Sequence, residues 1–243
     1  MKICNNHHRS QSFFQKIEKI LRFLNSSISQ NFSNFRIYTI FKSNKRILLF
    51  LFEEKIIKPD ISIACSFLSD KNMAKNYHAY FYPEFENFFK QLKNHNDFKF
   101  EEIHQFYEKN KDNFEYKRKI GENDDYICTL IQNDSIEEFV QFINKTNLSL
   151  RTTIKTSIFE TNPFLLKRKS ISLIEYSAFF GSIQIFQYLF LNKAEITEFI
   201  WLYAIHSQNP DLIHLIEEQK IIIRKISYEM IFNESIKCHH NSF

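Results

Sequence analysis

The hydrophobic and polar positions between Ser172 and Ala194 predict two short helices joined by a tight turn. Small and apolar residues recur at helical spacing at positions 173, 174, 177 and 178, and again at positions 185, 186, 189 and 190. Ser172 and Glu175 have the spacing of a capping box at the start of the first helix. Gly181 suits the left-handed conformation that ends a helix, and Ser182 is placed to cap the next one. Neither helix buries its apolar face alone, so the pair requires neighbours.

The same plan returns elsewhere in the second half of the chain. Residues 202–218 contain another helix pair, in which Asn209 and Pro210 form a strong helix start. Residues 134–143 match residues 181–190, and Ser135 with Glu138 forms a second capping-box pattern. A fourth copy begins at residues 234–241, and the sequence ends before its second helix. Helix pairs recurring every few tens of residues predict a solenoid.

The stretch SAFFGSIQIFQYLFLNKA resembles the ankyrin repeat, with a small residue, two large residues, Gly181 and then paired aliphatic residues. Residues 121–243 as a whole are similar to a degenerate group of ankyrin-type proteins expanded in protists, in phrases such as KRKIGENDDYICTLIQNDSIEEFVQFINKTNLSL and WLYAIHSQNPDLIHLIEE. The sequence departs from the family where the usual Thr-Pro-Leu-His is Ser-Leu-Ile-Glu at residues 172–175, and where the spacing between copies is unequal.

The resemblance implies an all-α fold, an α-solenoid of stacked helix–turn–helix (ankyrin-type) repeats with an irregular helical N-terminal half. It divides the chain into a helical region of degenerate repeats, residues 1–120, and ankyrin-type repeats, residues 121–243, of which the last is truncated. It also implies a non-enzymatic protein–protein interaction module or scaffold with a protein partner. On the ankyrin pattern, and with packing as the alternative role for Phe179, the expected partner-binding residues are Phe179, Phe180, Ile205, His206, Lys167, Arg168 and Lys169.

In the first half, the pattern predicts an amphipathic helix over residues 13–24 and a polar connector over residues 26–34. It predicts further helices over residues 35–41, 47–54, 61–68, 70–82, 84–93 and 100–108. The charged residues 109–125 are expected to join the two halves. The long insertion at residues 146–169 contains β-branched residues that favour a short hairpin or finger.

Composition and charge exclude some classes of function and predict a cellular compartment. A net charge of +4 over 243 residues is too small for a nucleic-acid-binding surface, so no nucleic acid is expected. No apolar run is long enough to span a bilayer, and the opening residues lack the apolar core of a signal peptide. Four well-separated cysteines without a CxxC motif indicate a reduced setting. These features predict the cytoplasm, with the nucleus as an alternative, and no membrane insertion.

Recognisable catalytic or cofactor motifs are missing, because two glycines cannot build a P-loop or a dinucleotide fingerprint. The clearest metal candidates are Cys4 with His7 and His8, and Cys238 with the histidines at 239 and 240. Since the ends of a solenoid lie far apart, we expect no metal, no cofactor and no catalytic residues. The alternative is a helical enzyme or enzyme accessory subunit with an unrecognised site in residues 1–120.

A third reading is a truncated paralogue. A missing capping helix would expose apolar surface from Ile231, Phe232 and Ile236, and such a chain would either need a partner or fold poorly.

Overall fold

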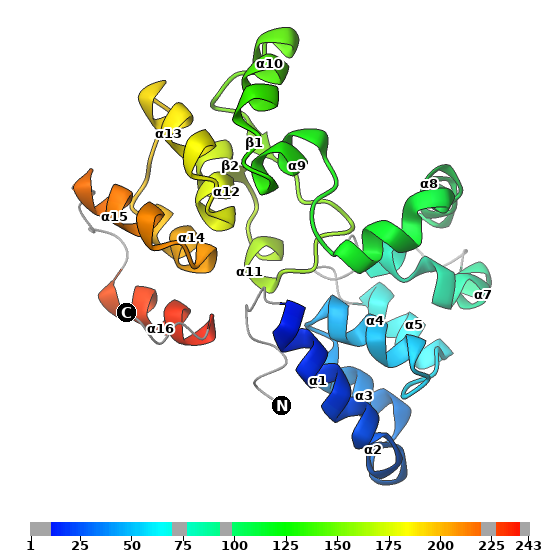
Figure 1. Cartoon of the computed structure of the whole chain (residues 1–243). Coiled ribbons are helices and arrows are strands. Elements are labelled where there is room, and N and C mark those ends of the chain that lie inside the picture. Colours follow the sequence, from blue (N-terminus) through cyan, green and yellow to red (C-terminus); the bar gives the residue numbers. More distant parts are fainter. Residues whose placement is uncertain (1–10, 70–76, 93–98, 220–226, 239–243) are drawn as a thin grey trace. The chain divides into compact units, whose positions relative to one another are not determined.

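A computed structural model describes residues 11–69, 77–92, 99–219 and 227–238 of the chain, and most of these residues are helical (Figure 1). The terminal Cys-His candidates at residues 4–8 and the histidines at 239 and 240 lie outside them, as does most of the helix predicted over residues 70–82. The chain divides into two compact units. The first contains the described residues through Glu122 together with Ser157–Pro163, and the second contains Asn123–Thr156 and the residues from Phe164 onward.

The helices of the first unit are α1 (Gln11–Phe23), α2 (Asn25–Asn31), α3 (Asn34–Phe41), α4 (Lys45–Glu53), α5 (Ile61–Ser69), α7 (Tyr82–Leu92) and α8 (Phe100–Ile120). The polar connector predicted over residues 26–34 is wrong, because most of it forms α2. The joint predicted over residues 109–125 contains the boundary between the two units, which falls after Glu122, although most of this stretch is helical. α8 continues to Ile120, and Gly121 ends it in the left-handed conformation, with φ of 72°.

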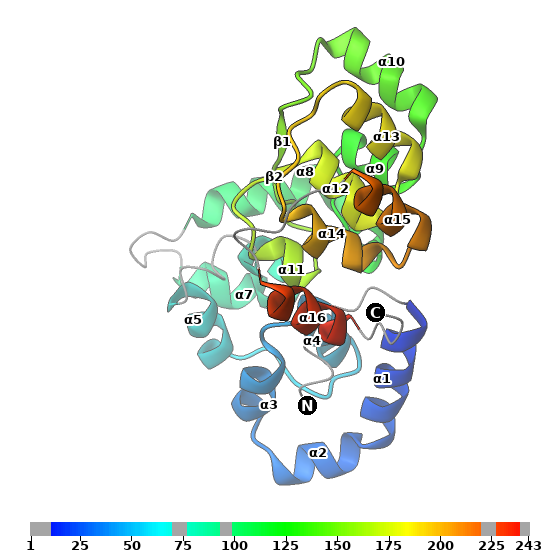
Figure 2. The ribbon, with the colours of Figure 1, turned by 90° about the vertical axis from the view of Figure 1, so that its left-hand side faces the viewer.

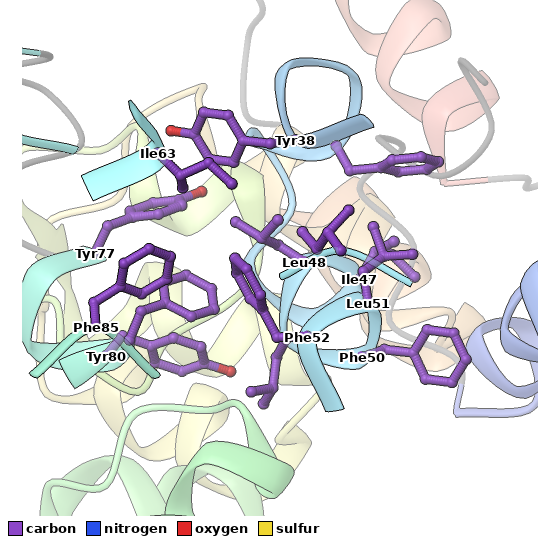
Figure 3. Packing of buried hydrophobic residues seen from close by; sticks show 14 of the residues in the cluster. Tyr38, Ile47, Leu48, Phe50, Leu51, Phe52, Ile63, Tyr77, Tyr80 and Phe85 are labelled. Atoms are coloured by element: carbon purple, nitrogen blue, oxygen red, sulfur yellow. The ribbon is translucent and has the colours of Figure 1, made fainter. Parts of the chain in front are cut away.

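The core of the first unit is built around α4, whose residues are buried from Ile47 to Phe52. Figure 3 shows these side chains beside aromatic rings from helical residues 77–80 and from α7. The rings of Phe52 and Phe85 meet edge to face with centroids 5.3 Å apart. Aromatic pairs of this kind add to the free energy of area burial. The dense packing explains why α4 is apolar on all sides rather than on one stripe.

Residues 157–163 belong to the first unit because a buried amine holds their backbone. Lys45 Nζ donates hydrogen bonds to the carbonyl oxygens of Ile158 at 2.7 Å and Glu160 at 3.1 Å. The amine also lies 4.8 Å from the centroid of the Tyr80 ring. Burial lowers the pKa of Lys45 to about 7, with the Glu160 carboxylate opposing that shift. The Lys45 amine therefore fixes a segment that follows it by more than a hundred positions.

A buried ion pair also stabilises the first unit. The guanidinium of Arg118, at the end of α8, donates two hydrogen bonds to the Glu84 carboxylate, at 2.7 and 2.9 Å. It also donates to the carbonyl oxygen of Tyr80 at 3.0 Å. Burial raises the pKa of Glu84, while Arg118 opposes this shift.

The second unit contains α9 (Tyr126–Gln132), α10 (Ile136–Thr146), β1 (Thr153–Ile154), α11 (Pro163–Leu166), β2 (Ile171–Ser172), α12 (Leu173–Phe180), α13 (Ile183–Leu191), α14 (Ile200–Ser207), α15 (Pro210–Glu218) and α16 (Tyr228–Lys237). The insertion does not form the expected short hairpin by itself. Instead, Thr153 within the insertion pairs in an antiparallel ladder with Ser172, which lies just after the insertion. Figure 2 shows these two short strands beside α12.

Three helix hairpins pack side by side in the second unit. α9 pairs with α10, α12 with α13, and α14 with α15. The first helices follow one another, since α12 contacts both α9 and α14, and α14 contacts α16 (Figure 1). Most residues that the pattern assigns to the core, including Leu173, Ile185 and Leu212, are fully buried, whereas Phe190 is half-buried.

The helix ends partly follow the predicted caps. Ser172 and Glu175 form the capping box, and Gly181 ends α12 with φ of 74°. Asn209 caps α15, with Pro210 in the first turn. Ser135 makes no side-chain capping hydrogen bond, so its predicted capping box is wrong.

The start of α13 is capped from a neighbouring hairpin. Ser182 does not cap it, because the Ser182 hydroxyl donates to the carbonyl oxygen of Ile131. The carboxylate of Asp134 accepts hydrogen bonds from the backbone N–H groups of Gln184 at 3.1 Å and Ile185 at 3.0 Å. Consecutive turns are therefore joined by hydrogen bonds as well as by apolar packing.

Candidate functional site

Three of the seven residues predicted to bind a partner lie in the interior of the second unit. Phe179, Ile205 and His206 are all at most 3% exposed. The His206 ring packs against Phe164, with centroids 4.3 Å apart, and against Phe179 at 4.8 Å. These side chains support the stack and are not accessible to a macromolecule.

The other four predicted residues retain some exposure. Lys167 and Lys169 are exposed, while Phe180 and Arg168 are half-buried. The Arg168 guanidinium lies 4.4 Å from the centroid of the Phe164 ring. The Phe180 ring packs on Tyr176 with centroids 4.7 Å apart. The basic segment after α11 thus remains accessible at its two lysines.

An exposed apolar surface lies on α16, the last helix of the stack in the described residues. Tyr228, Phe232 and Ile236 are 77, 58 and 53% exposed. Because these residues are four apart, they line one face of the helix. Ile231, which the sequence placed in the same exposed surface, is half-buried. The adjacent face of α16 is turned inward, where Glu234, Ser235 and Cys238 are buried.

The inward face of α16 meets α14 through a polar cluster. His206 Nε2 lies 3.0 Å from Glu234 Oε1. Cys238 Sγ lies 3.4 Å from His206 Nδ1 and 3.7 Å from Nε2. The other Glu234 oxygen, Oε2, accepts a hydrogen bond from Lys237 Nζ at 3.0 Å. The three side chains offer an imidazole nitrogen, a carboxylate oxygen and a sulfur within 4.8 Å of one another.

Sequence reasoning missed this cluster because its members were assigned to different roles. His206 was expected at a partner surface, and Cys238 was grouped with the two histidines that follow it. The available signal was the spacing of Glu234 and Cys238, which places both on one face of a helix. The partner histidine lies on another helix, and only the packing of α14 against α16 identifies it.

No family model, curated protein or solved structure matches the chain. None of the helices in the described part of the chain is both long and apolar enough to cross a bilayer.

Proposed function

We propose that the chain is a non-enzymatic protein-interaction module, an ankyrin-type α-solenoid that binds a protein partner. The proposal is supported by the side-by-side hairpins of the second unit, joined through Asp134 and Asn209 at successive turns. Stacked hairpins of this kind present an extended surface on a rigid support.

The observation that carries the proposal is the exposed apolar face of α16. Within the stack, α12 and α14 each contact a first helix on either side and a second helix of their own hairpin. In the described residues α16 contacts α14, while Tyr228, Phe232 and Ile236 remain exposed. An amphipathic helix of a partner protein would continue the stack by burying these three side chains. Apolar patches on stable proteins commonly mark such contacts.

The experiment compares proteins recovered on the purified full chain from cells that express it naturally. The test variant carries Phe232→Ser and Ile236→Ser, and the matched control carries Ile20→Ser and Phe23→Ser on α1. The control residues are also exposed, at 56 and 85%. Losing two anchor residues weakens binding by about tenfold or more.

A specific partner is expected to be retained by the wild type and by the α1 control, and lost from the α16 variant. Equal recovery on both variants would contradict the proposal. Circular dichroism and the fluorescence of Trp201 establish that the variants remain folded.

A further inference from the structure

We propose that His206, Glu234 and Cys238 form a zinc-binding site that ties α16 to α14. The site goes beyond the interaction module proposed above and does not depend on it. It rests on the identity of the three donor groups, their separations and their burial.

The distances suit a single ion. A tetrahedral zinc ion with bonds of about 2.0–2.3 Å to nitrogen, oxygen and sulfur holds neighbouring ligand atoms about 3.3–3.6 Å apart. His206 Nε2 lies 3.0 Å from Glu234 Oε1 and 3.7 Å from Cys238 Sγ. All three donor atoms lie within 4.8 Å of one another, so side-chain shifts of about 1 Å or less bring them around one metal.

The donor set favours zinc over other divalent ions. Thiolate and imidazole ligands together select zinc in a reduced setting, whereas magnesium and calcium prefer oxygen ligands alone. The carboxylate supplies the third of the four ligands that a structural zinc site takes, so a fourth donor is required to complete it. Lys237 Nζ, 3.0 Å from Glu234 Oε2, orients the carboxylate from outside the ligand set.

The matching positions of the other helices in the stack show that helix packing does not require a carboxylate or an imidazole here. Glu234 stands where the matching helices carry the buried tyrosines Tyr176 and Tyr203. The matching residue for His206 in α12 is the buried Phe179. Apolar and aromatic side chains therefore fill the same places elsewhere in the stack. Burying a carboxylate and an imidazole instead carries a desolvation cost, which their mutual contact and Lys237 offset in part and metal coordination would offset further.

A catalytic thiol is less consistent with the same geometry. Cys238 is 2% exposed, and the His206 side chain beside it is 1% exposed. A nucleophile must reach a substrate, whereas a structural metal is normally enclosed by protein. The bound ion therefore has a structural role, holding α16 against α14, rather than a catalytic one.

The test uses the reduced full chain, stripped of metal by a chelator and titrated with Co²⁺. Cobalt in a tetrahedral thiolate site gives visible d–d bands and a thiolate-to-cobalt charge-transfer band. We expect one Co²⁺ per chain, displaced by Zn²⁺, and a higher thermal midpoint with Zn²⁺ bound. An unchanged spectrum of the wild-type chain would overturn the proposal without reference to any variant.

Variants assign the ligands. Cys238→Ser is expected to lose the charge-transfer band, and His206→Gln and Glu234→Gln to weaken Co²⁺ binding at least about tenfold. Cys128→Ser, at another buried cysteine of the second unit, is the matched control and retains the band. Cys4→Ser also retains it. A band that survives Cys238→Ser, or one lost in either control, would overturn the assignment. The helical circular dichroism of each metal-free variant establishes its fold.

Discussion

Asp134 provides the sharpest test of how the hairpins are joined. Its carboxylate caps α13 from the preceding hairpin, through the N–H groups of Gln184 and Ile185. Its backbone is left-handed, with φ of 51°, a conformation that Asp and Asn tolerate better than Ala. Replacing it by Ala therefore removes two hydrogen bonds, removes a negative charge from a helix N-terminus and adds backbone strain.

The magnitude follows from these three contributions. Losing an N-cap acceptor costs about 0.5–2 kcal/mol, and losing the charge costs about 0.3–1 kcal/mol. We expect Asp134→Ala to lower the unfolding free energy by about 2 kcal/mol. Asp134→Asn keeps an acceptor oxygen and loses only the charge, so we expect a decrease of about 0.5 kcal/mol. Asp134→Gly relieves the backbone strain but has no side chain to cap the helix, so its decrease in unfolding free energy should lie between those of the Ala and Asn variants.

The assay is equilibrium unfolding in urea followed by the fluorescence of Trp201, the single tryptophan of the chain, which lies in α14 of the second unit. With a slope of about 2 kcal/mol per molar urea, the Ala variant shifts the midpoint by about 1 M. Raising the salt concentration should shrink the difference between wild type and the Asn variant, because that difference is electrostatic. An Ala variant with the wild-type midpoint, or an Asn variant as unstable as the Ala variant, would refute the reasoning.

Three further perturbations test other parts of the fold. Arg118→Met should lower the unfolding free energy by about 3–5 kcal/mol, because it leaves the Glu84 carboxylate buried without its guanidinium. Chemical denaturation should show a smaller decrease in the double variant that also carries Glu84→Gln. An equal decrease in both variants would contradict this account. For Lys45, the pKa is about 7 in the folded chain against 10.5 ordinarily, so between these values the unfolded chain binds a proton that the folded chain does not. The unfolding free energy should therefore rise from about pH 7 to about pH 9 and fall as the pH returns to 7. Urea titrations followed by circular dichroism should show no such rise for the Lys45→Met variant. A rise of the same size in that variant would mean that other groups cause it. Gly181→Ala places a Cβ 3.1 Å from Ser207 Cβ in a residue whose φ is 74°. The thermal midpoint should therefore fall by the equivalent of about 1–3 kcal/mol of unfolding free energy. An unaltered midpoint would show that alanine is not strained at this position.

The sequence alone predicted several local features of the second unit. The helical spacing around Gly181, the capping box at Ser172 and the Asn209-Pro210 start each depend on residues within one or two turns. The periodicity of apolar residues likewise predicted many of the buried positions, such as Leu173, Ile185 and Leu212, whereas the buried Ile205 was expected at a partner surface. These signals are local because a helix closes its hydrogen bonds between residues four apart.

Only the tertiary structure decided which distant groups meet. The cap on α13 comes from Asp134 rather than from Ser182. Lys45 draws residues 157–163 into the first unit. His206 lies beside Glu234 and Cys238 only because α14 packs against α16. Each pairing joins groups more than twenty residues apart, and no periodicity along the chain records such a separation. Their positions depend on how the apolar faces of separate helices fit together, which is settled by packing across the whole unit.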